Sequence, residues 1–239
     1  MEAFDRVKSF LGETGYNKLK NSSVAVFGVG GVGGYTVEAL VRCGVGRIDV
    51  FDGDKVEESN LNRQIIATYK TIGKDKVEVV KERALSINPD VIINAHKVFY
   101  LSDNADKYDL KNYDYVIDAV DTVSAKIELI MRAKSAGVRI ISCMGTGGKI
   151  NPEKLTVCDI EKTSGCPLAR VMRKELKTRG IKDVKVVYSE EQVVKGKTDT
   201  GKKADGKTAP ASLIFVPATA GLLLAKTVVM DIIGNGEKI

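Results

Sequence analysis

Short apolar runs alternate with longer amphipathic stretches over the first 148 residues. The runs are rich in Val and Ile and predict strands at 24–28, 47–51, 91–97, 114–118 and 138–142. Between them, apolar residues recur at helical spacing over 31–44, 74–87 and 123–136. Strands that alternate with helices form a parallel sheet covered by helices, so we predict an α/β, Rossmann-like, mostly parallel sheet with helices on both faces.

The pattern changes after Gly148, where the elements become shorter. They predict a C-terminal extension with antiparallel strands at 155–159 and 184–188, around a helix at 167–178. With 239 residues, of which 44% are hydrophobic, the chain can bury one large core. We expect a single domain over 1–239, with an ATP-binding half at 1–148 and the extension at 149–239.

The most apolar stretch lies at 212–234 and approaches the length of a membrane span. Pro217, Lys226 and Asp231 interrupt it, and a charge in the middle of a spanning helix costs about 2.5–3.5 kcal/mol. We therefore predict a buried strand at 213–216, followed by a terminal core helix, and no membrane span.

Cysteine usage narrows the class of protein. The four cysteines, at positions 43, 143, 158 and 166, form no CxxC pair, which argues against a disulfide framework and a structural zinc site. The N-terminal segment carries acidic residues and no continuous apolar stretch, unlike a secretory signal. These features predict a reduced, cytoplasmic protein.

The net charge of +6 is concentrated in one segment. Residues 170–207 hold 12 Lys or Arg and 6 Asp or Glu, so the rest of the chain is neutral. We expect a mobile basic loop over about 189–211, because its centre has almost no apolar side chain to bury. The segment is either a solvated surface or a contact for a polyanion, since clustered Lys and Arg gain by releasing phosphate counterions.

A glycine-rich turn follows the first strand. Gly28, Gly30, Gly31 and Gly33 lead from that strand into a helix, where glycines allow a tight turn and let backbone N–H groups approach a phosphate. Asp52 follows the second strand, at the place of an acid that accepts hydrogen bonds from ribose hydroxyls. Taken alone, this pattern predicts a nicotinamide-dependent dehydrogenase.

The polar residues that come next favour different chemistry. They are Asp54, Asn60, Arg63, Gln64 and Lys76, with Asp118 and Asp121 after a later strand. Hydride transfer does not need an Arg and a Lys near the adenosine, whereas attack on the α-phosphate of ATP does. Cations neutralise the charge that develops as pyrophosphate leaves, and a carboxylate can hold Mg²⁺ against the phosphates.

Together these motifs resemble the adenylation domain of the E1-like superfamily, which includes the MoeB and ThiF adenylyltransferases and the ubiquitin-activating enzymes. The resemblance rests on the GxGGxG turn, D-x-D at 52–54, S-N-L-N-R-Q at 59–64, Lys76 and D-A-V-D at 118–121. These motifs span about half the chain.

The resemblance implies roles for individual residues. The implied ATP-binding set is Gly28, Gly30, Gly31, Gly33, Asp52, Asp54, Asn60, Arg63, Gln64 and Lys76. Within it, Asp52 would bind the ribose, and Asn60, Arg63 and Lys76 would contact the phosphates. Asp121 would place Mg²⁺. The resemblance also implies a homodimer in which Arg6 reaches the partner's ATP.

The second half resembles one branch of this superfamily, the tRNA threonylcarbamoyladenosine dehydratases (TcdA/CsdL). This resemblance rests on C-P-L-A-R-V-M-R from 166, S-L-I-F-V-P-A-T-A-G from 212 and F-D-R-V-K-S-F-L-G from 4. It implies ATP-dependent dehydration of N6-threonylcarbamoyladenosine in tRNA, through adenylation of its carboxylate, and raises a cysteine-desulfurase system as a further partner. One departure is Cys166, where an aspartate is expected.

Two other classes of protein stay open. A MoeB/ThiF-like adenylyltransferase would act on the C-terminal glycine of a ubiquitin-fold sulfur carrier, but such enzymes usually add paired CxxC motifs. A nicotinamide-binding oxidoreductase or a nucleotide-sensing scaffold would have no use for Asn60, Arg63 and Lys76. The dehydratase interpretation also gives the basic segment a role, namely holding the tRNA backbone.

Two single residues have both a chemical and a structural interpretation. Cys166 precedes Pro167 at a predicted helix start, where a thiol can have a lowered pKa and form a thioester or persulfide. The same segment also fits an ordinary helix start, with Ser164 as a polar cap. His96 lies in an apolar strand region, which favours a structural or surface role over a general base or a metal ligand.

Overall fold

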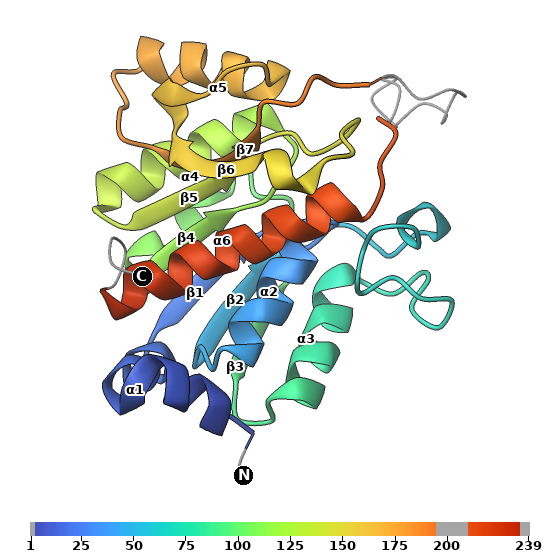
Figure 1. Ribbon diagram of the computed structural model, residues 1–239, viewed down its shortest axis with the longest axis vertical. Coiled ribbons are helices and arrows are strands. Elements are labelled where there is room, and N and C mark those ends of the chain that lie inside the picture. The colour runs from blue at the N-terminus through green and yellow to red at the C-terminus, as the bar shows by residue number, and fades with distance from the viewer. Residues whose placement is uncertain (1–2, 195–209, 235–239) are drawn as a thin grey trace.

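The computed structural model describes residues 3–194 and 210–234, and its centre is a seven-stranded sheet (Figure 1). The strands follow the order β3-β2-β1-β4-β5-β7-β6 across the sheet. Neighbours are parallel except β6 and β7, which pair antiparallel. Their bounds are β1 Ser23–Phe27, β2 Arg47–Phe51, β3 Ile92–His96, β4 Tyr115–Asp118, β5 Arg139–Cys143, β6 Leu155–Asp159 and β7 Lys185–Ser189.

Helices cover both faces of this sheet. One face carries α2 (Gly33–Arg42), α3 (Lys76–Ile87) and α6 (Phe215–Ile233), and the other carries α4 (Val123–Ala136) and α5 (Pro167–Thr178). Residues of β1 alternate between the two cores, as side chains of a strand must: Val24 and Val26 lie in the first core and Ala25 and Phe27 in the second. The predicted fold class, including the antiparallel strands and the terminal helix, is therefore confirmed.

The predicted elements differ from the observed ones mainly at their ends. The helices predicted at 123–136 and 167–178 have the predicted bounds, and the others agree within about two residues. The basic loop predicted over about 189–211 lies mostly outside the described residues. The division of the chain into halves at residue 148 stays a prediction, because the sheet runs without a break from β4 through β5 to β7.

The strand predicted at 213–216 is wrong, because α6 begins at Phe215. Pro217 stands in the first turn of this helix, where a missing N–H removes no intrahelical hydrogen bond. The sequence prediction treated Pro217 as an interruption, although it marks a helix start. By length and composition α6 could cross a membrane, and half of its most apolar window is buried inside the fold. It packs against α2 and crosses the sheet, as a core helix does (Figure 1).

Helix α1 (Asp5–Lys20) packs against the edge of the sheet at which the parallel strands begin. The carbonyl of Leu19 accepts a hydrogen bond from the N–H of Gly46, just before β2. Lys18 Nζ donates to the carbonyl of Ile233 at 2.9 Å, so the end of α6 lies at the same edge. Gly12 breaks the helical backbone inside α1 with φ of 71°. No helix was predicted here from the sequence.

Candidate nucleotide-binding site

The glycine turn joins β1 to α2 at the carboxyl edge of the sheet, where β1 lies between β2 and β4. Gly28 has φ of 84°, and a Cβ there would lie 2.7 Å from the carbonyl oxygen of Ala119. A Cβ at Gly33 would lie 1.8 Å from the carbonyl oxygen of Gly28. The backbone can therefore close this turn only with glycine at these two positions.

Gly30 and Gly31 are not required by the fold in this way. A Cβ at Gly30 would meet Gln64 Nε2 at 3.6 Å, and one at Gly31 would meet Arg63 Cγ at 3.5 Å, which are ordinary contacts. Glycine at these positions leaves room for another molecule to come close to the backbone. A phosphate at the start of a helix, bound by backbone N–H groups, is the group that needs such room.

Asp52 joins the glycine turn to the end of β2. Its Oδ2 accepts a hydrogen bond from the N–H of Val29 at 2.8 Å, and its Oδ1 accepts one from the N–H of Asp54 at 2.9 Å. Burial raises the pKa of Asp52, and the charge of Lys76 together with these amide hydrogen bonds offsets part of the effect. The carboxylate is held in one orientation beside the turn, where it can accept hydrogen bonds from a ribose.

Lys76 and Asp54 form an ion pair, with 2.8 Å between Nζ and Oδ2. The lysine side chain is 7% exposed and the aspartate side chain 53% exposed. An ammonium group has three N–H donors, so the pair leaves donors of Lys76 for a phosphate. Asp54 thus orients Lys76, which was not foreseen from the sequence.

Arg63 lies over the glycine turn, with its stem against Gly31. Its guanidinium donates to the carbonyl of Ser59 at 2.9 Å and to Asn62 Oδ1 at 2.8 Å. It forms no ion pair with a carboxylate within the described residues, and burial lowers the pKa of Arg63. A partly buried cation without a carboxylate partner favours an anionic ligand.

Gln64 and Asn60 flank this arginine. The buried Oε1 of Gln64 has no hydrogen-bond partner in the described part of the chain, and its amide group faces Gly30. Asn60 is largely used in the fold, since its Oδ1 accepts from the N–H of Glu57 at 3.1 Å and its Nδ2 donates to Ser59 Oγ at 3.2 Å. The glycine turn, Arg63 and the unsatisfied oxygen of Gln64 together fit a bound nucleotide.

Asp121 lies in the turn after β4, on the other side of the glycine turn from Asp52, and its side chain is exposed. The N–H of Ala119 in the same turn donates to the carbonyl of Phe27 at 2.8 Å, next to Gly28. Residues 3–194 and 210–234 contain no group of three or more His, Cys, Asp or Glu that could hold a metal. A single carboxylate fits Mg²⁺ that is also bound by phosphates.

The structure does not bring Arg6 to this site. Arg6 lies near the start of α1, at the edge of the sheet opposite the glycine turn of its own chain. Every other residue of the set predicted from the sequence lies at the carboxyl ends of β1, β2 and β4 or in the segment that follows β2.

Cys166 is the N-cap residue of α5, as the sequence predicted, and only 2% of it is exposed. No side chain caps this helix; instead, the carbonyl of Ser164 accepts a hydrogen bond from the N–H of Cys166 at 2.7 Å. The thiol lies near Gly145, enclosed by protein. A nucleophilic role for Cys166 therefore receives no support from its position.

His96 is partly buried at the end of β3, the edge strand of the sheet. Its ring stacks on Phe51 with 4.3 Å between centroids, and its Nε2 lies 3.2 Å from Asp49 Oδ2. The structural role predicted for His96 agrees with these contacts.

The start of α6 forms part of the site and was missed from the sequence. The Cβ of Pro217 would lie 3.6 Å from a Cβ at Gly31, and Asn62 Nδ2 donates to the carbonyl of Ser212 at 2.9 Å. A Cβ at Gly221 would lie 2.4 Å from the carbonyl oxygen of Val32, so the close packing of α6 on α2 requires glycine at this position. The run of small residues around Gly221 is the signal that could have revealed this contact.

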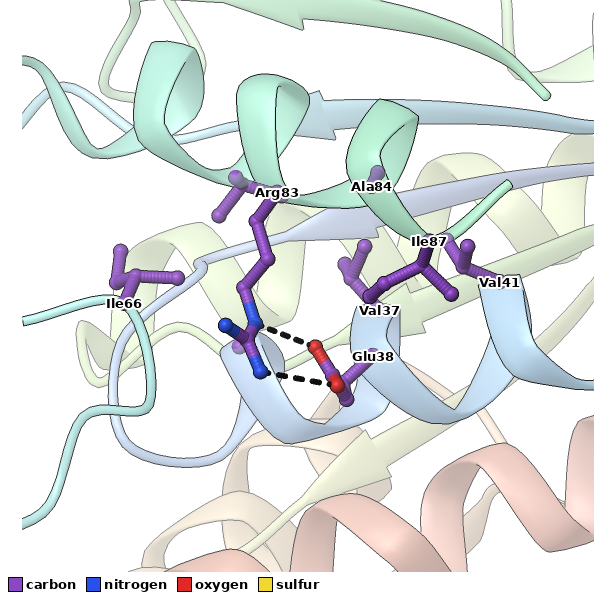
Figure 2. Close-up of a pocket in the computed structure, with 9 residues that line it drawn as sticks. Val37, Glu38, Val41, Ile66, Arg83, Ala84 and Ile87 are labelled. Atoms are coloured by element: carbon purple, nitrogen blue, oxygen red, sulfur yellow. Dashed lines mark hydrogen bonds and ion pairs between the residues drawn. The ribbon is translucent and has the colours of Figure 1, made fainter. Parts of the chain in front are cut away.

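A small crevice lies between α2 and α3, and its lining begins at Gly34, directly after the glycine turn (Figure 2). Figure 2 shows Arg83 of α3 pointing toward Glu38 of α2 across it, and the two side chains are joined by hydrogen bonds of 2.6 and 3.1 Å. The remaining lining is mostly apolar, with Val37, Val41 and Ile87 among its residues. This crevice is a packing feature of the two helices and has no chemistry suited to a nucleotide.

Comparison with known proteins identifies the family of this chain. The model of the ThiF family matches residues 5–238. The chain belongs to the ThiF family. It is 39% identical to the tRNA threonylcarbamoyladenosine dehydratase of Bacillus subtilis (strain 168), over 99% of this chain and 97% of that protein. The predicted membership of the E1-like superfamily, and the resemblance to its dehydratase branch, are confirmed.

Solved structures of a tRNA N6-threonylcarbamoyladenosine dehydratase share the same fold. The tRNA N6-threonylcarbamoyladenosine dehydratase of E. coli, TcdA, was solved in complex with ATP and in complex with AMP. The ATP complex has a TM-score of 0.87 and 31% identity, and the match covers 97% of this chain and 93% of that chain. For the AMP complex the TM-score is 0.88, and the coverage is 96% and 93%.

Adenylyltransferases match a smaller part of the chain. The sulfur carrier protein adenylyltransferase of Thermus thermophilus is 41% identical, but over only 46% of this chain and 41% of that protein. The dehydratase match, in contrast, includes the second half of the chain with β6, α5, β7 and α6.

Proposed function

We propose that this protein is an ATP-dependent tRNA threonylcarbamoyladenosine dehydratase. The observation that carries the proposal is the site itself: Arg63, without a carboxylate partner within the described residues, lies over a glycine turn that has room for a phosphate. This geometry supports nucleotide binding and neutralisation of a leaving pyrophosphate. The full-length likeness to dehydratases supports the choice of substrate.

In the proposed complex, Asp52 accepts hydrogen bonds from the ribose of ATP, and the N–H groups of the glycine turn bind its phosphates. Arg63 and Lys76 approach the phosphates from the segment after β2, with Asn60 and Gln64 beside them. Asp121 would hold Mg²⁺, which supplies further neutralisation of phosphate charge when bound.

The reaction consists of two steps at this site. A carboxylate oxygen of the threonylcarbamoyl group attacks the α-phosphorus of ATP, the bond to the bridging oxygen breaks, and pyrophosphate leaves. A nitrogen of the same modification then attacks the activated carbonyl, loses its proton, and AMP leaves, so that the nucleoside has lost one water. The chain needs no nucleophile of its own, because the ring-closing nitrogen is already near its target.

The outer face of α5 supports the tRNA part of the proposal. Arg170, Lys174 and Lys177 recur at i, i+4 and i+7, all three are exposed, and none forms an ion pair with another described residue. Arg173 and Arg179 are used within the fold, bonded to Thr163 and to Glu175. We propose that the first three contact the tRNA backbone, together with the basic segment that continues to residue 207.

The proposal has four further parts, which the family resemblance, the cysteine usage and the position of Arg6 support. We expect a homodimer, because Arg6 could serve only the site of another copy from the edge at which α1 lies. We also expect Mg²⁺ dependence, a cytoplasmic location and cooperation with a cysteine-desulfurase system.

A release assay with ATP labelled at the α-phosphate tests the function. The protein is incubated with tRNA that carries the threonylcarbamoyl modification and, as a control, with the same tRNA lacking it. The nucleosides are then analysed by mass spectrometry. We expect AMP to form only with the modified tRNA, together with a nucleoside lighter by one water.

Two results would contradict this proposal. The protein would be an adenylyltransferase if its ATP cleavage does not depend on tRNA but requires a ubiquitin-fold sulfur carrier with a C-terminal glycine. If ATP is cleaved with neither substrate and the protein binds a nicotinamide dinucleotide, the glycine turn would instead be that of a dehydrogenase.

A further inference from the structure

A buried ion pair lies beneath the turn that carries Asp121. Lys126 of α4 and Asp118 at the end of β4 have 3.0 Å between Nζ and Oδ2, and both side chains are 0% exposed. Lys126 uses all three of its N–H donors, since it also donates to Ser142 Oγ at 3.4 Å and to the carbonyl of Cys143 at 2.7 Å. This ammonium group therefore joins α4 to the carboxyl ends of β4 and β5.

Asp118 links Lys126 and Ser142 to the backbone of the turn that follows β4. Its Oδ1 accepts a hydrogen bond from the N–H of Val120 at 3.1 Å, while its Oδ2 accepts from Lys126 and Ser142. Ala119 lies between Asp118 and Val120 in the sequence, and its carbonyl oxygen is so close to Gly28 that Gly28 could not carry a Cβ. Asp118 thus holds the backbone that leads directly into Asp121 against the glycine turn.

Stabilisation of the fold does not by itself explain why Lys126 and Asp118 form a buried ion pair. Replacing a buried ion pair by apolar residues is often neutral or stabilising, because two charges must be taken out of water. Lys126 occupies a core-facing position of α4, among Ile127, Leu129 and Ile130, where an apolar residue would pack readily. The polar network is instead concentrated at the one turn that borders both the phosphate site and Asp121.

We propose that Lys126 is a positioning residue, which acts through Asp118 to hold the turn 119–122 and so sets where the Asp121 carboxylate stands relative to bound phosphates. Its consequence for catalysis rests on the proposed function. The structural step, ordering of the turn, does not depend on it.

The test compares two variants with a matched control. Lys126→Met combined with Asp118→Asn removes both charges without leaving one unpaired. Ser142→Ala keeps both charges and removes the hydroxyl that donates to Asp118 Oδ2 and accepts from Lys126 Nζ. The control is Ser22→Ala, because Ser22 is also buried and donates one hydrogen bond, to the carbonyl of Leu19 at 2.7 Å, but lies at the opposite edge of the sheet.

Hydrogen exchange of the backbone amides in 119–122 is the first readout and requires neither ATP nor tRNA. We expect exchange about tenfold faster in the double variant and a smaller increase in Ser142→Ala, with no change in Ser22→Ala. In the AMP-formation assay, half-saturating Mg²⁺ should rise about tenfold and kcat should fall, while KM for ATP stays within about threefold.

Unchanged exchange at 119–122 in a folded double variant would overturn the proposal. Equal acceleration in Ser22→Ala would also overturn it, because the effect would then reflect general loss of stability. If the wild-type protein forms no AMP with modified tRNA, the proposed function fails, but the exchange measurements still decide whether Lys126 orders the turn.

Discussion

The four glycines of the nucleotide-binding turn serve different purposes. Gly28 and Gly33 close the backbone, whereas Gly30 and Gly31 leave space in front of it. The sequence showed the GxGGxG pattern but could not separate the two pairs, because the atoms that exclude a Cβ belong to Ala119 and to Gly28 itself.

This difference predicts opposite outcomes for two alanine substitutions. Gly33→Ala should lower the free energy of unfolding by about 3 kcal/mol or more, since its Cβ overlaps a carbonyl oxygen. Gly30→Ala should leave the free energy of unfolding nearly unchanged, because its Cβ makes only ordinary contacts. It should weaken ATP binding about tenfold, because the methyl group would occupy the space that a bound phosphate needs. Urea unfolding and calorimetric titration with ATP measure the two quantities. Normal ATP affinity in Gly30→Ala would show that the ligand does not approach this part of the turn.

Residue-scale prediction from sequence succeeded where a polar side chain follows directly after a strand. Asp52, Asp54 and Asp121 could be placed at one edge because parallel strands end there. The pairing of Lys76 with Asp54 and of Lys126 with Asp118 could not be predicted, since each depends on how a helix packs on the sheet. For Lys126 a signal existed, namely a lysine on the apolar stripe of its helix.

At the scale of elements, α2 and α3 are joined by charges as well as by apolar contacts. Glu38 accepts hydrogen bonds from Arg83 and Arg42, and its side chain is only 10% exposed. Burial alone would raise the pKa of Glu38, but the hydrogen bonds and charges of the two arginines outweigh it and hold the pKa below its ordinary value.

We predict that Glu38→Gln lowers the free energy of unfolding by about 1–2 kcal/mol at neutral pH. A carboxyl with a lowered pKa stabilises the fold at pH values above its unfolded pKa, about 4.3, and this contribution is lost as the pH falls through the lower folded pKa. The difference between wild type and variant should therefore shrink below about pH 4 in urea unfolding from pH 3 to 7. A difference that stays constant over this range would show that the charge of Glu38 is not responsible.

Element types were predicted well where the hydrophobic period was long and the boundaries carried turn residues. Helix α4 ends at Ala136, as predicted, and Gly137 follows it in the left-handed region with φ of 70°. The run 213–216 was too short for its period to separate strand from helix, and α1 has two glycines in its middle, Gly12 and Gly15. In both cases contacts with distant segments decided the structure.

At the scale of the whole molecule, charge is distributed unevenly, and α5 presents a basic face. We predict that combined replacement of Arg170, Lys174 and Lys177 by Gln raises KM for modified tRNA and lowers the salt dependence of tRNA binding. For every phosphate that the variant no longer neutralises, the slope of log K against log [salt] should fall in magnitude by about 0.7–0.9. Filter binding at several salt concentrations measures the slope, and ATP affinity without tRNA should not change.

A charge-matched control uses exposed lysines on other parts of the surface. Lys70, Lys107 and Lys111 are exposed and lie outside α5. Their combined replacement by Gln removes the same net charge, so it should leave the salt slope close to that of the wild type. Equal effects of the two sets would mean that tRNA responds to overall charge rather than to the face of α5.

The position of α6 also has a consequence for biosynthesis. This helix follows all the other described elements along the chain, yet its Pro217 lies against Gly31, and the carbonyl of Gly221 accepts a hydrogen bond from Thr36 Oγ1 at 3.1 Å. A nascent chain leaving the ribosome exposes β1, the glycine turn and α2 early, but these lack their cover until residues 215–221 emerge. ATP can therefore stabilise the fold through this turn only after α6 has left the ribosome, and the face of α2 that packs on α6 stays uncovered until then.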